Sequence, residues 1–249
     1  MHHHKTLLLT TGLLLITGTH AATFNTIKVD DPVKPGSKCE VRKPVGSPGA
    51  LITRFDQVDM LLIVSLWTCK DSGFIALMND FKLSETEKTA IAAFLSKRYD
   101  KKEGLYERHS REAVRRRWQL LESVYKLRRK DRLFNNRLLR MHAFILDMLH
   151  YYPVANRYRK KALNDIKDML AGKLAETTRL RYLYVAAAYE RQFGNTASSD
   201  AYIEKLRKLA KTMSGKKNSA YADYMMKFIK DIKLIKPGGS LLPAQYRSQ

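Results

Sequence analysis

Between Gly172 and Gly194 the chain reads GKLAETTRLRYLYVAAAYERQFG, a segment of helix length enclosed by two glycines. Its apolar side chains recur at intervals of three and four residues, which places them on one face of an α-helix. The positions that carry this pattern are Leu180, Leu183, Tyr184 and Ala187. The pattern predicts a helix whose apolar face is buried, with the aromatic residue in the core rather than in a ligand site.

Helix breakers divide the rest of the C-terminal half into similar segments. Intervals of 19 to 22 residues separate Pro153, Gly172, Gly194, Gly215 and Pro237. Each interval has room for a helix of about four to five turns and a short connection. Short connections between similar helices favour antiparallel neighbours. The sequence therefore predicts a mainly α protein built as an antiparallel helical hairpin stack.

The helical region is expected to begin near Ser84. Residues 84–87, Ser-Glu-Thr-Glu, have the form of a capping box, in which the Ser84 hydroxyl and the Glu87 carboxylate each accept a hydrogen bond from the other residue's amide. Residues 105–151 then predict two long helices. We expect a helical-repeat domain over residues 84–236, followed by a flexible tail over residues 237–249.

The segment before the helices has a different composition. Residues 23–47 are polar and rich in proline and glycine, which favours loops with at most short strands around Cys39. Residues 59–68 form a short apolar run that suits a buried strand leading into Cys69, although periodicity alone does not distinguish it from a helix. Residues 22–80 are therefore expected to form a small module of strands and irregular structure.

The first 21 residues have the features of a secretory signal peptide. A polar start with Lys5 precedes the apolar stretch from Leu7 to Gly18, and the small residues that a signal peptidase reads follow at 19–21. A dozen residues are too few for a membrane-spanning helix, which needs about 20. The alternative is a histidine tag followed by a buried helix. We expect cleavage, a periplasmic or secreted location and no transmembrane span in the mature chain.

The expected compartment determines how the two cysteines are interpreted. Cys39 and Cys69 are 30 residues apart in a chain expected to meet an oxidising environment. A single disulfide between them is the default expectation there. The alternative is a pair of buried free thiols.

One stretch of the sequence resembles a known family. Residues 67–76 read WTCKDSGFIA and residues 79–88 read NDFKLSETEK. The stretch is similar to the second half of a zinc-ribbon module in an uncharacterised bacterial family, where two Cys-x-x-Cys knuckles precede a tetratricopeptide-like helical region. The resemblance is most specific over residues 66–91 and implies a tetratricopeptide-like stack after the module.

The chain departs from this family at half of the zinc ligands. If Cys39 and Cys69 are the first ligands of the two knuckles, then Arg42 and Ser72 stand where the second cysteines would be. Two thiolates cannot form the closed four-ligand site of a structural zinc, so we expect no metal and no cofactor. Sulfurs around one zinc lie about 4 Å apart, so the resemblance also implies that a disulfide could replace the metal.

Charge is the strongest functional signal in the sequence. The chain has 46 Lys and Arg against 24 Asp and Glu, a formal net charge of +22, and residues 97–140 hold 16 basic against 6 acidic residues. We predict a basic belt that binds a protein partner, an anionic envelope polymer or a lipid headgroup. Nucleic acid is disfavoured as a partner if the chain is exported. The proposed contacts are Arg108, Arg111, Arg115 and Arg117. Arg116, Arg128, Arg129 and Lys130 extend the predicted belt. The alternative is a solvated cationic face without a ligand.

Catalytic signatures are absent from the sequence. It contains no metalloprotease, nucleophile-elbow, Walker or dinucleotide-binding motif, and we assign no catalytic residue. His142 is interpreted as a core histidine with one hydrogen-bond partner. The first hypothesis is a non-catalytic interaction or scaffold protein. The alternative is a periplasmic peptidoglycan hydrolase, which needs two carboxylates in a cleft. A third hypothesis, a cytoplasmic zinc-dependent protein, requires bound metal.

Overall fold

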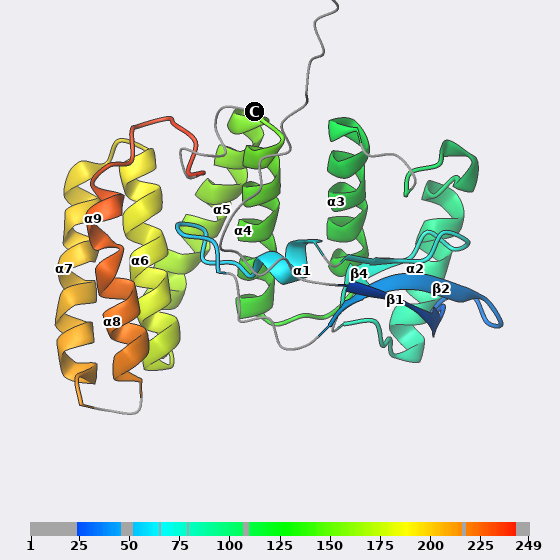
Figure 1. Cartoon of the computed structure of the whole chain (residues 1–249), viewed down its shortest axis with the longest axis horizontal. Coiled ribbons are helices and arrows are strands. Elements are labelled where there is room, and N and C mark those ends of the chain that lie inside the picture. The colour runs from blue at the N-terminus through cyan, green and yellow to red at the C-terminus, as the bar shows by residue number, and fades with distance from the viewer. Residues whose placement is uncertain are drawn as a thin grey trace, which may run out of the picture.

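The protein is mainly α-helical, as predicted. The computed structural model describes residues 24–45, 52–64, 66–78, 80–106, 110–215 and 218–242. The expected signal peptide, Arg108 and residues 243–249 lie outside these ranges. The helices pack in antiparallel pairs and are arranged approximately in chain order from one end of the molecule to the other, with two small sheets at the N-terminal end (Figure 1). No described helix has the length and apolar character that crossing a membrane would require.

The C-terminal helices lie between the predicted breakers, but the last interval, from Gly215 to Pro237, contains two short helices where one was expected. The C-terminal helices are α5 (Tyr152–Ala171), α6 (Glu176–Gln192), α7 (Thr196–Met213), α8 (Ser219–Lys227) and α9 (Ile229–Ile232). Pro153 lies in the first turn of α5, where its missing amide leaves no helical hydrogen bond unmade. Gly194 and Gly215 follow α6 and α7 with φ of +83° and +73°, a conformation that glycine adopts without strain.

The preceding helices start at side-chain caps. They are α2 (Glu85–Arg98), the 3-10 turn η1 (Lys101–Glu103), α3 (Arg111–Lys126) and α4 (Arg132–Met148). The capping box at the start of α2 is confirmed: Glu87 N donates to Ser84 Oγ over 3.3 Å, and Ser84 N donates to Glu87 Oε2 over 2.8 Å. Ser110 and Asp131 cap α3 and α4 from one side only: their side chains accept hydrogen bonds from the amides of Ala113 and Phe134.

The N-terminal module contains two antiparallel hairpins. Strand β1 (Phe24–Asp30) pairs with β2 (Lys38–Pro44), and β3 (Leu66–Thr68) pairs with β4 (Ile75–Leu77). The strand expected over residues 59–68 is wrong for its first half, because Met60–Val64 is the short helix α1. The Asp59 carboxylate accepts a hydrogen bond from the Leu61 amide at 2.9 Å and so stabilises this helix start.

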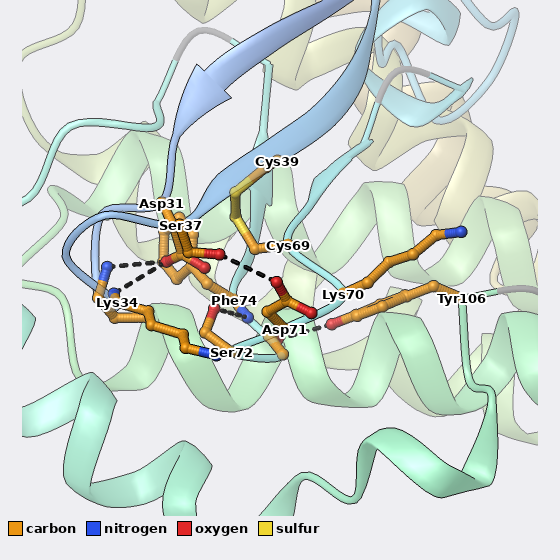
Figure 2. The surroundings of a disulfide bond; sticks show 12 residues. Asp31, Lys34, Ser37, Cys39, Cys69, Lys70, Asp71, Ser72, Phe74 and Tyr106 are labelled. Atoms are coloured by element: carbon orange, nitrogen blue, oxygen red, sulfur yellow. Dashed lines mark hydrogen bonds between the residues drawn. A yellow bond between two sulfur atoms is a disulfide. The ribbon is translucent and has the colours of Figure 1, made fainter.

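A disulfide joins the two hairpins. The sulfurs of Cys39 on β2 and Cys69 after β3 are 2.01 Å apart, and both residues are buried (Figure 2). Cys69 begins a tight turn in which its amide donates to Phe74 O and the Gly73 amide donates to Cys69 O, both at 2.8 Å. Cys39 lies on an extended strand instead, so Cys39 and Arg42 do not form a second turn of that kind.

The interior consists of two apolar clusters. The N-terminal core combines the hairpins with α2, α3 and one face of α4, and the C-terminal core is formed by α5 to α9. The predicted boundary near residue 80 does not separate the two cores, because Phe74 and Ile75 pack in the same cluster as Ile91 and Trp118. The module therefore shares its interior with the first helices.

Two segments connect the N-terminal and C-terminal cores. In the loop before α1, Phe55 packs in the C-terminal core and Val58 in the N-terminal core. After α9, Leu241 packs in the C-terminal core and Leu242 packs in the N-terminal core. Residues 237–242 are thus packed against the helices, in contrast to the flexible tail expected from residue 237.

Candidate anion-binding surface

Helix α3 carries the basic residues that the sequence singled out. Its apolar face buries Trp118, Leu121 and Val124, which leaves Arg111 exposed on the other side. Arg111 has no carboxylate partner among the described residues. Arg108 lies outside the described residues.

Arg115 is already held by a carboxylate. Its Nε and Nη2 donate to the two carboxylate oxygens of Glu112 over 2.8 and 2.6 Å. These hydrogen bonds raise the pKa of Arg115 and lower the pKa of Glu112. The guanidinium also lies 5.7 Å from the centre of the Tyr151 ring at the start of α5. Arg115 therefore presents less net charge to a partner than Arg111 does.

Arg117 does not share the face of Arg111 and Arg115. Residues two apart on an α-helix point about 200° apart. Arg117 is half-buried on the side of Tyr106, and burial lowers its pKa. The neighbouring Arg116 pairs with Glu103. Arg111, Arg115 and Arg117 therefore do not form one uniform belt, because helical rotation separates Arg117 from the other two.

Helix α5 extends the basic surface beyond what the sequence indicated. Tyr158 donates a hydrogen bond to Glu122 of α3 over 2.5 Å, and the Lys161 ammonium lies 5.8 Å from the centre of the Tyr158 ring. Arg157 is exposed beside them. Only tertiary packing brings α3 and α5 together, so sequence spacing contains no sign of this arrangement. We call Arg111, Arg115, Arg157 and Lys161 the α3–α5 surface.

Arg128, which the sequence placed in the belt, is instead a buried clamp. Its side chain is 1% exposed and binds Asp80 and Glu87, with Nη2–Oδ1 and Nε–Oε1 distances of 2.9 and 3.2 Å. The guanidinium also donates to the carbonyls of Asp80 and Lys82 over 2.7 and 2.8 Å. Arg128 therefore fixes the start of α2 against the end of α3.

A second polar cluster lies beside a pocket between α3 and α4. This pocket of 270 Å³ is lined by Glu122, Lys126 and His142, among others. His142 is buried and stacks on Tyr158 at 4.5 Å between ring centres. Burial lowers the pKa of His142 to about 4, so its ring is neutral at pH 7. This burial agrees with the expected core histidine, although its Nδ1 has no hydrogen-bond partner among the described residues.

Glu122 is the carboxylate of this cluster. Burial raises its pKa, but hydrogen bonds from Tyr158 and Lys126 outweigh burial, and the net effect is a lowered pKa. Its Oε2 lies 3.6 Å from His142 Nδ1, beyond hydrogen-bond distance. A carboxyl group that stays ionised is poorly suited to donate a proton as a general acid.

A fully buried ionic network holds the loop before α1 against the helices. Arg159 Nη2 is 3.1 Å from Asp56 Oδ2 and 2.6 Å from Asp147 Oδ2, and the Tyr189 hydroxyl donates to Asp56 over 2.6 Å. Burial opposes the charge on Arg159, but the two aspartates outweigh burial and raise its pKa. Leu241 N donates to Asp147 over 3.0 Å. The network is structural, because its carboxylates are at most 2% exposed.

The residues closest to a metal-ligand arrangement surround the disulfide. Asp31 lies with Cys39 and Cys69 in a group whose potential ligand atoms are all within 4.8 Å of one another. Asp31 Oδ1 accepts hydrogen bonds from the amides of Val33 and Lys34 at 3.0 and 3.1 Å (Figure 2). Both sulfurs belong to the disulfide, and metals bind the thiolate form of cysteine. In this oxidised form the group therefore offers a metal one carboxylate.

Comparison with protein-family models, with curated proteins and with solved structures finds no match to this chain. The geometry of its own side chains is therefore the basis for a functional proposal.

Proposed function

We propose that the protein is an exported, non-catalytic interaction protein that binds an anionic partner of the cell envelope. The partner would be an acidic protein, an anionic polymer or a lipid headgroup. The antiparallel pairs α4–α5 and α6–α7 support the helical-repeat part of this proposal. The excess of 22 positive charges supports the choice of an anionic partner, because a field of this sign attracts polyanions.

The observation that carries the proposal is the composition of the α3–α5 surface. Arg111 is exposed without a carboxylate partner among the residues that the structure describes, and Arg157 and Lys161 add positive charge from α5. The rings of Tyr151 and Tyr158 lie beneath Arg115 and Lys161. Guanidinium groups supported in this way can form charge-assisted hydrogen bonds to phosphate or carboxylate groups.

Charge reversal at Arg108 and at two arginines of α3 tests the proposal. Replacing Arg108, Arg111 and Arg115 by Glu should abolish binding to phosphatidylcholine vesicles containing phosphatidylglycerol and to lipopolysaccharide at low salt. A matched control replaces Lys205, Lys211 and Lys227 by Glu, which changes the charge equally on α7 and α8. Unchanged binding of the α3 variant, or equal loss in the control, would reject the α3–α5 surface as the site.

Export is tested by the intact mass of the protein from its native compartment. Cleavage after residue 21 or 22, together with a two-hydrogen deficit for the disulfide, is the expected result. A full-length chain with two alkylatable thiols would contradict export and make nucleic acid the first partner to examine.

The alternative of a peptidoglycan hydrolase has a specific location to test. Asp100 and Glu103 both line a pocket of 420 Å³ between α2 and α3. Glu103 pairs with Arg116, and Asp100 accepts a hydrogen bond from the Lys102 amide over 2.8 Å, so each carboxylate has a structural role. This favours the binding proposal. Release of peptidoglycan fragments that is lost in Glu103→Gln would favour the hydrolase instead.

A further inference from the structure

A pocket between the N-terminal ends of α4 and α6 collects three arginines. It has a volume of 230 Å³, and Arg137 and Arg140 reach it from α4 and Arg181 from α6. Its remaining lining residues are Asp131, Leu133, Phe134, Thr178 and Tyr182. We call this site the arginine pocket. None of its residues belongs to the α3–α5 surface.

The three guanidinium groups are not neutralised within the described chain. Arg137, Arg140 and Arg181 form no ion pair with a described carboxylate. The only carboxylate in the lining, Asp131, caps α4 by accepting a hydrogen bond from the Phe134 amide over 2.6 Å. The pocket therefore has an excess of positive charge.

Packing holds the arginines in place. Arg140 is 2% exposed, and its Nη1 donates to the carbonyls of Asp56 and Gln57 over 2.5 and 2.8 Å. Arg181 Nε donates to the Tyr221 hydroxyl over 3.0 Å. Arg140 and Arg181 line the same pocket, and burial lowers the pKa of Arg140. Arg140 and Arg181 are thus arranged before any ligand arrives, which reduces the entropic cost of binding.

The first turn of α6 brings Thr178 to the pocket, and the same turn also carries the carboxylate of Glu176. The N-cap of α6 is Ala175, which offers no side-chain acceptor to the amides of the first turn, and Thr178 of that turn lines the pocket. A helix N-terminus carries a partial positive charge and favours anions. Together with two hydroxyl groups and three guanidinium groups, this arrangement suits a group with several negatively charged oxygens.

We propose that the arginine pocket binds the phosphate group of a small phosphorylated molecule. Arg137 and Arg181 contact the phosphate oxygens, and Thr178 donates its hydroxyl. A phosphate monoester matches three cations better than a singly charged carboxylate does, because it carries nearly two charges and three free oxygens. The exposed side chain of Leu133, which also lines the pocket, provides apolar contact for the organic part. This site is distinct from the α3–α5 surface and does not depend on it.

The test is calorimetric titration of the full chain with phenyl phosphate at an ionic strength of about 0.15 M, where long-range charge effects are screened. We expect saturable binding of one molecule per chain. Arg181→Gln should weaken it about tenfold or more, which is the effect of removing a charged hydrogen-bond partner. Arg181→Lys keeps the charge but loses the planar guanidinium group. Its affinity for phenyl phosphate should lie between those of the wild type and Arg181→Gln.

Two further variants separate the site from general charge and from folding. Arg98→Gln removes the same charge on α2, outside the pocket and outside the α3–α5 surface, and should change the affinity less than about threefold. Thr178→Val removes a hydroxyl without changing charge and should weaken binding, so it replaces Arg181→Gln if loss of the Tyr221 contact unfolds that variant. No saturable binding, or equal weakening by Arg98→Gln, would overturn the proposal.

A vesicle experiment distinguishes a soluble ligand from a lipid headgroup. Binding to vesicles containing phosphatidic acid that depends on Arg181, without binding of phenyl phosphate, would assign the pocket to a lipid and overturn a soluble ligand. The Glu variants of Arg111 and Arg115 should leave phenyl phosphate binding unchanged. Failure of this inference is therefore distinguishable from failure of the proposed function.

Discussion

Two adjacent arginines at the end of α3 show how strongly position determines the role of a side chain. Arg128 is buried and binds Asp80 and Glu87, whereas Arg129 is exposed. In the sequence they are two similar members of one basic run. Only the contacts of Arg128 with the residues before α2 distinguish them.

Arg128→Met is expected to lower the free energy of unfolding by about 3 kcal/mol or more, because it removes the buried guanidinium that binds Asp80, Glu87 and two carbonyls. Arg129→Met is the matched control and should change stability by less than about 0.5 kcal/mol. Urea unfolding of the wild type, Arg128→Met and Arg129→Met measures both changes in stability. An equal loss of unfolding free energy in the two variants would contradict the conclusion that Arg128 holds α2 against α3.

His142 makes stability depend on pH in a defined direction. Its pKa is lowered to about 4 in the folded protein, whereas an unfolded histidine has a pKa near 6.5. The unfolded state therefore binds more protons between these values, and the folded state loses stability as the pH falls through this window.

The expected loss from His142 between pH 7 and pH 5 is about 2 kcal/mol. His142→Phe keeps a ring against Trp118 and Tyr158 but cannot titrate. Its free energy of unfolding should fall less over the same interval, as measured by urea unfolding at both pH values. Carboxylates contribute equally to both proteins, so parallel pH profiles would show that His142 does not titrate as described.

At the scale of the elements, the turn after Cys69 depends on a glycine for two reasons. Gly73 has φ of +79°, and a Cβ at this position would lie 2.2 Å from the Tyr99 ring. Gly36, in the turn between β1 and β2, has the same φ but open space around it. A substitution at Gly36 therefore measures the cost of backbone strain alone, whereas one at Gly73 measures backbone strain together with the overlap with Tyr99.

Gly36→Ala should cost about 1 kcal/mol for the backbone conformation alone. Gly73→Ala should cost at least about 1 kcal/mol more, because Tyr99 must also move. The comparison is made by thermal or urea unfolding of the two single variants. A loss at Gly73 no larger than that at Gly36 would mean that the Tyr99 ring moves aside freely.

At the scale of the whole molecule, the two cores are joined by short segments that are distant in sequence. The loop before α1 and residues 237–242 both reach α4, and the buried aspartates Asp56 and Asp147 fix them there. The N-terminal module and the end of the chain consequently stabilise the same helices. We expect them to unfold together with the helices rather than separately.

Leu241 tests this arrangement. It is 3% exposed, and Leu241→Ala should lower the free energy of unfolding by about 2–4 kcal/mol in a single transition. Leu234, which is 76% exposed, is the control, and Leu234→Ala should cost less than about 0.5 kcal/mol. Circular dichroism during urea unfolding measures both. An early transition confined to the N-terminal half would contradict the shared stability of the cores.

The sequence by itself determined the features that depend on neighbouring residues. Breakers such as Gly194 and Gly215, the capping box at Ser84 and the apolar stripe beginning at Leu180 act within one or two helical turns, so the helices could be predicted from them. The pairing of the only two cysteines follows from their number once an oxidising compartment is assumed.

Only the tertiary structure decided which charges are free and where they meet. It turned Arg128 into a clamp, paired Arg116 with Glu103, and brought Arg140 and Arg181 to one pocket from helices that are not adjacent in sequence. It also made Met60–Val64 a helix within a run that suited a strand. The physical reason is the same in each case: burial and ion pairing depend on residues that are distant along the chain, and no local periodicity records them.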